Sequence, residues 1–132
     1  MVRGTTTQFR FKLPRKVNEL ISARIDFWQD GYYGISEDRP LPIVKNLNQC
    51  SRLDSEYYLS VTLNQEETFR FSDDRKAYVQ LQALAVDGLT YSHKQREITV
   101  YSQHNDDILG DVVIPTPEED GIVVLDGGVI GG

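Results

Sequence analysis

Apolar and polar residues alternate along most of the chain, which is the pattern of β-strands with one buried and one exposed face. Residues 9–13 read Phe-Arg-Phe-Lys-Leu, and Pro14 ends this strand because proline lacks a backbone donor. The same alternation predicts strands in residues 57–63 and 77–85, the second of which supplies the longest inward-facing row. A helix over residues 75–86 is the alternative, because alanine, leucine and glutamine favour helices, but the strict alternation favours a strand.

Two short turn signals place hairpins in this pattern. Asp30-Gly31 follows a strand over residues 21–28, and Asp87-Gly88 follows the longest inward-facing row. Residues 32–35 are expected to return alongside the first of these strands, and a last strand is expected over residues 89–103. Four residues of the first strand are predicted to face the core, namely Ile21, Ala23, Ile25 and Phe27.

The stretch between the two hairpins is less regular. Pro40 and Pro42 interrupt residues 38–54, where at most a short edge strand fits around Ile43, and residues 64–68 are expected to form a connection of one helical turn. About seven short strands and two tight hairpins thus fit into roughly 100 residues. The pattern predicts an all-β fold, an immunoglobulin-like β-sandwich of about seven strands with an extended C-terminal arm.

The sequence changes character after His104, which predicts two parts: a sandwich over residues 1–104 and an extended C-terminal arm over residues 105–132. Two β-branched runs flank Pro115-Thr116-Pro117, a segment that favours extended backbone. We expect the arm to add a strand to the sheet edge of a neighbouring molecule, the alternative being a disordered tail. The apolar residues predicted to make this interface are Ile108, Val112, Val113, Ile114, Ile122, Val123, Val124 and Leu125.

Charges are divided between the two ends of the chain. Residues 1–16 hold five bases and no acid, whereas residues 105–132 hold seven acids and no base, within a net charge of −6. Arg10, Lys12 and Arg15 are therefore predicted to contact the acidic arm of a neighbour, an attraction that screening limits to close contact. The acidic balance argues against direct binding of nucleic acid, and no apolar run approaches the roughly 18 residues of a membrane span.

No motif in the sequence points to catalysis, a cofactor or a metal. His93 and His104 are eleven residues apart without a further ligand at metal-like spacing, so both are interpreted as surface histidines. Nucleotide-binding glycine loops and nucleophile elbows are absent. Cys50 is the only cysteine, which excludes an intrachain disulfide and fits synthesis in a reducing compartment. We expect no enzyme activity.

Aromatic side chains are the remaining candidates for binding. Trp28, Tyr32, Tyr33, Tyr57 and Tyr58 are predicted on neighbouring strands, and such residues anchor protein interfaces and stack on sugars. Alternation turns about half of them toward the core, so simple packing explains most of them. Trp28, on the predicted outer face, is the strongest single interface candidate.

Five short segments carry a family resemblance. The chain opens with Arg3-Gly4-Thr5-Thr6, the Phe-x-Phe-x-Leu-Pro run of residues 9–14 and the Ile-x-Phe-x-Gln run of residues 25–29. Later come Leu-Asn-Gln-Glu-Glu-Thr-Phe-Arg-Phe at residues 63–71 and Val-Gln-Leu-Gln-Ala-Leu followed by Asp-Gly within residues 79–88. In this order they resemble small virion structural proteins encoded in phages and prophages of Gram-positive gut Firmicutes, over about residues 3–109. The chain differs from them in a longer 38–56 region and in the stretch after residue 110.

The resemblance implies a virion structural component and brings no catalytic residues. The first expected function is therefore a bacteriophage head, neck or tail protein, made in the bacterial cytoplasm. Its termini would dock on other virion proteins and on copies of itself. The alternative is a baseplate or capsid-decoration module that binds host-surface glycans through Trp28 and the tyrosines.

Overall fold

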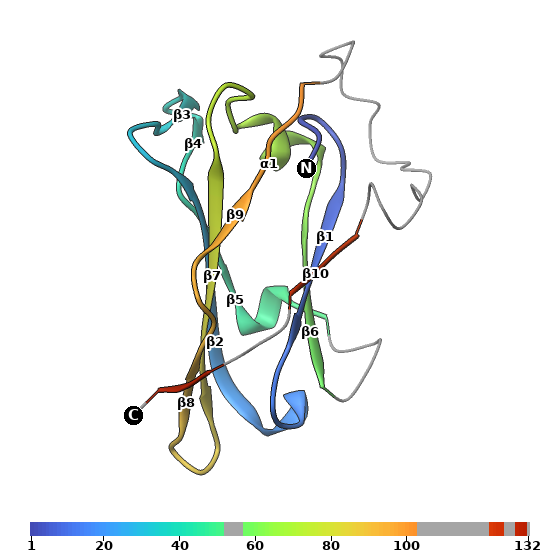
Figure 1. Cartoon of the computed structure of the whole chain (residues 1–132), viewed down its shortest axis with the longest axis vertical. Coiled ribbons are helices and arrows are strands. Elements are labelled where there is room, and N and C mark those ends of the chain that lie inside the picture. The colour runs from blue at the N-terminus through green and yellow to red at the C-terminus, as the bar shows by residue number, and fades with distance from the viewer. Residues whose placement is uncertain (52–56, 103–121, 126–128, 132) are drawn as a thin grey trace.

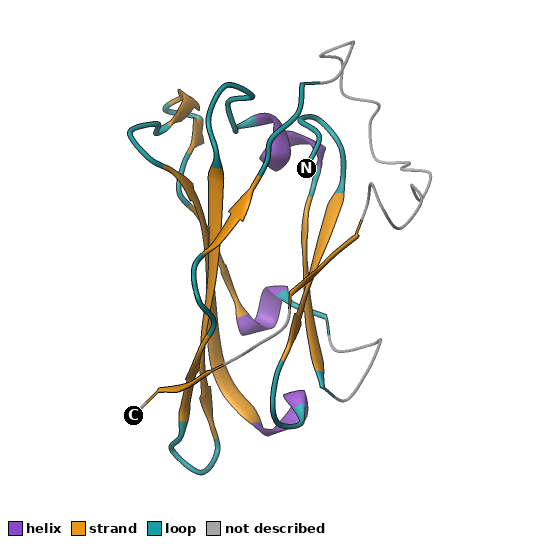
Figure 2. Cartoon of the chain, in the orientation of Figure 1, coloured by secondary structure: helices purple, strands orange, loops and turns teal. Residues whose placement is uncertain are grey.

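The alternating segments of the sequence form strands in the computed structural model, and the strands build two facing sheets (Figure 1). The structure describes residues 1–51, 57–102, 122–125 and 129–131, the last two segments by their backbone. Within these residues strands predominate, and each helix has only three to five residues (Figure 2). The predicted all-β sandwich is confirmed.

One layer of the sandwich is a three-stranded sheet in the order β10-β1-β6. β1 (Thr7–Lys12) lies at its centre, antiparallel to β6 (Tyr58–Leu63) and parallel to β10 (Ile122–Leu125). The other layer has the order β11-β8-β7-β2-β5, and β9 also pairs with β7. Its strands are β2 (Leu20–Gln29), β5 (Ile43–Asn46), β7 (Ala77–Ala85), β8 (Thr90–Ser92), β9 (Arg96–Ile98) and β11 (Val129–Gly131).

Short elements lie between the strands of the two layers. β3 (Gly34–Ser36) and β4 (Arg39–Pro40) form a small hairpin at one end of the molecule. The helices are η1 (Val17–Glu19), η2 (Leu47–Gln49) and α1 (Gln65–Phe69). In the described part of the chain, no helix has the length and apolar character to cross a membrane.

The core lies between the layers because alternate side chains of both sheets point into the same space. Phe9 on β1 and Phe27 on β2 meet edge to face across this space, with ring centroids 5.0 Å apart, and both are fully buried. The inward row of β7 is buried as predicted, which excludes the helical alternative for that segment. Its members are Ala77, Val79, Leu81, Ala83 and Ala85.

A β-bulge at the start of β2 corrects one predicted core residue. Leu20 pairs with Ala85 and Ser22 pairs with Leu84, so Ile21 is an extra residue between two consecutive pairs. The bulge turns Leu20 into the core and leaves Ile21 exposed, whereas Ala23 and the later inward residues keep their predicted side.

The two turn signals have different outcomes. Asp87-Gly88 joins β7 to β8 as predicted, with Gly88 at φ +85°. After Asp30-Gly31 only Tyr32 pairs back, with Gln29, because Gly34 adopts φ +101° and directs the chain into the β3–β4 hairpin. The strand that pairs with β2 on this side is β5, the short edge strand expected around Ile43.

The C-terminal segment lies on the sandwich of its own chain, which corrects the prediction that it pairs with a neighbour. β10, formed by the predicted interface residues 122–125, pairs with β1 from Gln8 opposite Ile122 to Phe11 opposite Leu125. β11 pairs antiparallel with β8, with Ile130 opposite Tyr91. Without them β1 and β8 would be open edges, and a β-branched segment of the same chain reaches these edges at high effective concentration. The predicted arm residues Ile108 and 112–114 lie outside the described residues.

One ten-residue stretch thus closes the same side of both sheets. β10 and β11 are separated by only three residues and lie on different layers (Figure 1). On the opposite side the chain passes from β5 to β6 through η2, and Ser51 exchanges two backbone hydrogen bonds with Ser60 at 2.7 and 2.9 Å. Segments of the same chain therefore pair with β1 and β8 on one side and with β6 on the other.

Candidate functional site

Arg15, predicted to face a partner, is held by side chains of its own domain. Its guanidinium pairs with the Glu19 carboxylate, donates to Asp87 Oδ2 at 2.7 Å and donates to Tyr91 Oη at 2.9 Å. The Tyr91 ring centroid also lies 5.6 Å from Arg15 Cζ, a cation–π distance. These contacts fasten the segment before η1 to the β7–β8 turn. The other two predicted cations lie on β1, Arg10 half-buried and Lys12 exposed.

Hydrogen bonding within this cluster changes the acidity of Asp87. The hydrogen bond from Arg15, aided by one from the Leu89 amide at 3.1 Å, holds the pKa of the Asp87 carboxyl below its usual value of 3.8. A carboxyl group with a lowered folded-state pKa stabilises the fold above its unfolded pKa, and this contribution is lost as the pH falls through the folded pKa.

Asp87→Asn should therefore make the free energy of unfolding less dependent on pH in the acidic range. We expect the free energy of unfolding to fall less between about pH 5 and pH 3 in this variant than in the wild type, as measured by urea denaturation across that range. Asp38→Asn, at the turn between β3 and β4, is the control for the loss of one negative charge. Equal acid slopes in the wild type and Asp87→Asn would contradict the role of the Arg15 pair.

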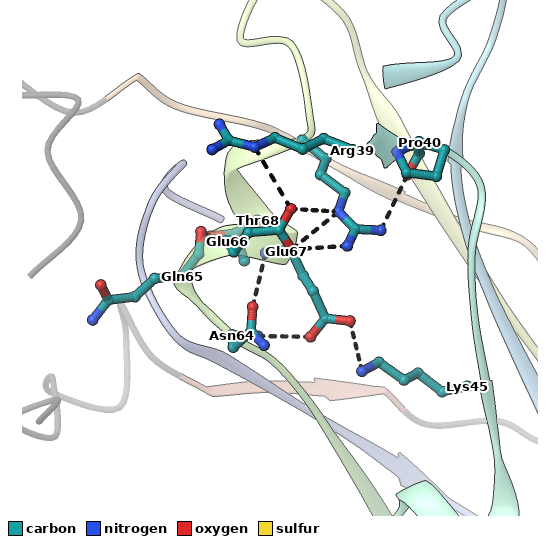
Figure 3. A network of polar contacts seen from close by, with 9 residues as sticks. Arg39, Pro40, Lys45, Asn64, Gln65, Glu66, Glu67 and Thr68 are labelled. Carbon is teal, nitrogen blue, oxygen red and sulfur yellow. Dashed lines mark hydrogen bonds and ion pairs between the residues drawn. The ribbon is translucent and has the colours of Figure 1, made fainter. Parts of the chain in front are cut away.

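A polar network around α1 joins the two layers at one end of the sandwich (Figures 1 and 3). Asn64 and Glu67 form a capping box. Asn64 Oδ1 accepts a hydrogen bond from the backbone N–H of Glu67 at 2.8 Å, and the backbone N–H of Asn64 donates to Glu67 Oε1 at 3.0 Å. The second carboxylate oxygen of Glu67 lies 2.7 Å from Lys45 Nζ on β5, with the two side chains only 11% and 14% exposed. Thr68 Oγ1 donates to the Thr5 carbonyl at 2.6 Å.

The outer side of α1 carries a second set of ion pairs. Arg70 Nη2 lies 2.8 Å from Glu66 Oε2, and Arg70 Nη1 donates to the Pro40 carbonyl at 3.4 Å. These contacts belong to the segment of residues 63–71, which forms the structural connection between β6 and β7. The one-turn helix expected at residues 64–68 is confirmed.

Lys45→Ala should destabilise the protein more than the loss of a surface lysine. It leaves the Glu67 carboxylate without its cation in a poorly hydrated place, so we expect a loss of about 2 kcal/mol. Lys76→Ala is the matched control, because its pair with Glu97 at 3.2 Å is exposed and contributes less than about 1 kcal/mol. Urea denaturation measures both variants, and equal losses would contradict the structural importance of the Lys45 pair.

His93 is buried, which corrects its interpretation as a surface histidine. Its ring lies edge to face with Phe11 at 5.5 Å between centroids, and Nε2 lies 3.1 Å from the Lys12 carbonyl oxygen. The expected last strand is interrupted here, with β8 ending at Ser92 and β9 starting at Arg96. The alternation of Tyr91 and His93 was the sequence signal for this burial. His104 lies outside the described residues.

The start of β2 and the β7–β8 turn lie at one end of the sandwich (Figure 1), and aliphatic side chains of both are exposed. Ile21, Val86 and Leu89 are 57%, 62% and 44% exposed. Their backbones converge, since the Val86 amide donates to the Glu19 carbonyl at 2.8 Å and the Ala85 amide donates to the Leu89 carbonyl at 2.9 Å. We call these three residues the aliphatic end. Sequence alternation missed it because the bulge exposes Ile21.

The other end, where β2 leads into β3, carries a cavity of about 390 Å³. We call it the aromatic hollow; the residues that line it include Asp26, Trp28, Asp30, Tyr32, Tyr33 and Pro42. Trp28 lies on the outer face of β2 as predicted and stacks on Tyr78 of β7, with ring centroids 5.8 Å apart. A larger cavity of about 570 Å³, at β2, β7 and β8, has Arg24 as the one charged residue among those described in its lining.

The described residues contain a single cysteine and no cluster of side chains that could bind a metal ion. No group of three or more histidine, cysteine or acidic side chains there could hold a metal ion. Cys50 is a free thiol whose Sγ lies 3.3 Å from the Asn46 carbonyl oxygen. Comparisons with protein-family models, curated proteins and solved structures found no match to this chain.

Proposed function

We propose that this protein is a structural component of a bacteriophage particle, a rigid spacer that packs against other virion proteins through its aliphatic end. The resemblance of residues 3–109 to virion proteins supports the class of particle. The exposure of Ile21, Val86 and Leu89 at one end of the sandwich is the observation that supports docking there. The termini, first expected to make these contacts, pair with the protein's own sheets instead.

The surroundings of the aliphatic end suit a protein interface. Exposed apolar side chains gathered at one place favour contact with another protein, and interfaces commonly surround an apolar centre with charged residues. The Arg15, Glu19 and Asp87 cluster lies at this same end and supplies such charges. Docking by a fixed end also leaves the two sheets undisturbed during assembly.

Purified particles test the proposal. Mass spectrometry of phage particles, released from the bacterium that encodes this chain, should find the protein at a fixed ratio to the major particle proteins. The double variant Val86→Asp with Leu89→Asp should fold but be missing from the particles, because two buried charges oppose the contact. Val44→Asp, at another exposed apolar position, is the matched control and should be incorporated. Particles that lack the wild-type protein would overturn the proposed function.

A further inference from the structure

The end of β2 that leads into β3 lies at the opposite end of the long axis from the β7–β8 turn (Figure 1). The aromatic hollow, which this end of β2 helps to line, therefore stays accessible when the aliphatic end is docked. Tyr33 on its rim is 78% exposed, which is unusual for so large a ring. The cavity of about 390 Å³ falls within the roughly 300–1,000 Å³ of small-molecule sites.

Hydrogen bonds hold the walls of the hollow in place. The buried Gln29 side chain donates to the carbonyls of Ser72 and Arg75 at 2.9 and 3.0 Å, and it accepts from the Ser72 amide at 2.8 Å. Arg75 in turn donates to the Asp30 carbonyl at 3.2 Å and lies 5.6 Å from the Tyr32 ring centroid. The turn at Asp30-Gly31 is thus fixed to the loop before β7, so a ligand would not have to order it.

The chemistry of the lining matches a neutral sugar. Aromatic rings pack against the C–H faces of a pyranose. Trp28, one of the rings in the lining, is held in place by its stack on Tyr78. The carboxylate of Asp30, also in the lining, is a suitable acceptor for sugar hydroxyls. We propose that the aromatic hollow is a carbohydrate-binding site for a neutral mono- or disaccharide unit, a binding activity separate from the proposed docking of the aliphatic end.

The charges in the hollow favour a neutral sugar over an anion or an organic cation. Two carboxylates and no base occur among the described residues of its lining, which disfavours a phosphate or another anion. An organic cation would bind a carboxylate or an aromatic face. The Asp26 carboxylate already accepts a hydrogen bond from Arg24 Nε at 2.8 Å, and the Tyr32 ring already has Arg75 over it. A neutral, hydroxyl-rich ligand avoids both difficulties.

Trp28 is the chain's only tryptophan and lines the hollow, so its fluorescence reports on binding there. We expect a saturable change in emission when the full chain is titrated with at least one of glucose, galactose, rhamnose or N-acetylglucosamine, with a midpoint on the order of millimolar. Tyr33→Ala should raise that midpoint about fivefold or more, since it removes an exposed wall without touching the core. Asp30→Asn should weaken binding as well.

Two sets of control measurements complete the binding test. Tyr101→Ala removes a tyrosine that is exposed elsewhere and should leave the midpoint unchanged. Choline chloride and inorganic phosphate, titrated in the same way, should give no saturable change. The proposal is overturned if no sugar saturates up to about 100 mM, if only choline or phosphate binds, or if Tyr33→Ala binds as well as the wild type. None of these outcomes bears on particle incorporation, so the two proposals fail separately.

Discussion

Deleting residues 122–132 should destabilise the sandwich and make it self-associate. The deletion removes β10 from β1 and β11 from β8, and it opens the edges of both layers on the same side. With a net contribution of roughly 0.5–1.5 kcal/mol for each backbone hydrogen bond lost, we expect the free energy of unfolding to fall on the order of 4 kcal/mol. Open edges recruit other strands, so size-exclusion chromatography with light scattering should detect oligomers.

Adding the missing strands back provides the control. A synthetic peptide of residues 118–132, supplied in excess, should restore both the unfolding midpoint and the monomeric state of the truncated chain. If the C-terminal segment did not belong to the sandwich, the deletion itself would have no effect. The truncated chain would then remain monomeric, with the unfolding midpoint of the full-length protein.

Phe27→Ala should cost about 3–5 kcal/mol, the usual range for removing a buried phenylalanine ring. Phe27 is fully buried near the end of β2, and its ring meets Phe9 of the other layer at 5.0 Å between centroids. The substitution therefore removes a contact between the layers and leaves a cavity in the middle of the core. Urea denaturation followed by circular dichroism measures the loss.

Two variants calibrate this result. Phe27→Leu keeps most of the apolar volume and should lose less than half as much stability, about 1.5 kcal/mol. Ile21→Ala should change stability by less than about 1 kcal/mol, because the bulge exposes the side chain. If Ile21→Ala cost as much as Phe27→Ala, the register of β2 would be wrong.

Local sequence determines the strands of this fold well. Alternation identified the buried row of β7 and the core side of β1, and Asp87-Gly88 identified a hairpin, because each signal acts between residues that are neighbours in the chain. The bulge at Ile21 escaped this reasoning. It depends on how Leu20 and Ser22 pair with β7, which lies more than sixty residues further along.

The candidate sites were predictable only in part. Trp28 was expected on the outer face and lies there, although its stack on Tyr78 depends on the pairing of β2 with β7. Arg15 was expected to contact a neighbouring molecule because the N-terminal segment is basic and the C-terminal segment is acidic. Its ion pair with Asp87 escaped this reasoning, since the two residues are distant in sequence. The C-terminal strands were assigned to another molecule for a related reason. Alternation shows that a segment is a strand, but not which sheet edge it completes.

Cysteine cross-linking most directly tests whether the C-terminal segment completes its own chain's sheets. Thr90 and Gly131 are opposite each other in the β8–β11 pair, where Cα separations of about 4.5–5.5 Å allow a disulfide. In a Cys50→Ser background, Thr90→Cys with Gly131→Cys should oxidise to a disulfide within a single chain. Thr62→Cys with Gly131→Cys, which places the first thiol on the other layer, is the matched control and should not cross-link. A monomeric, faster-migrating band on a non-reducing gel is the predicted result, and disulfide-linked dimers or no cross-link would contradict it.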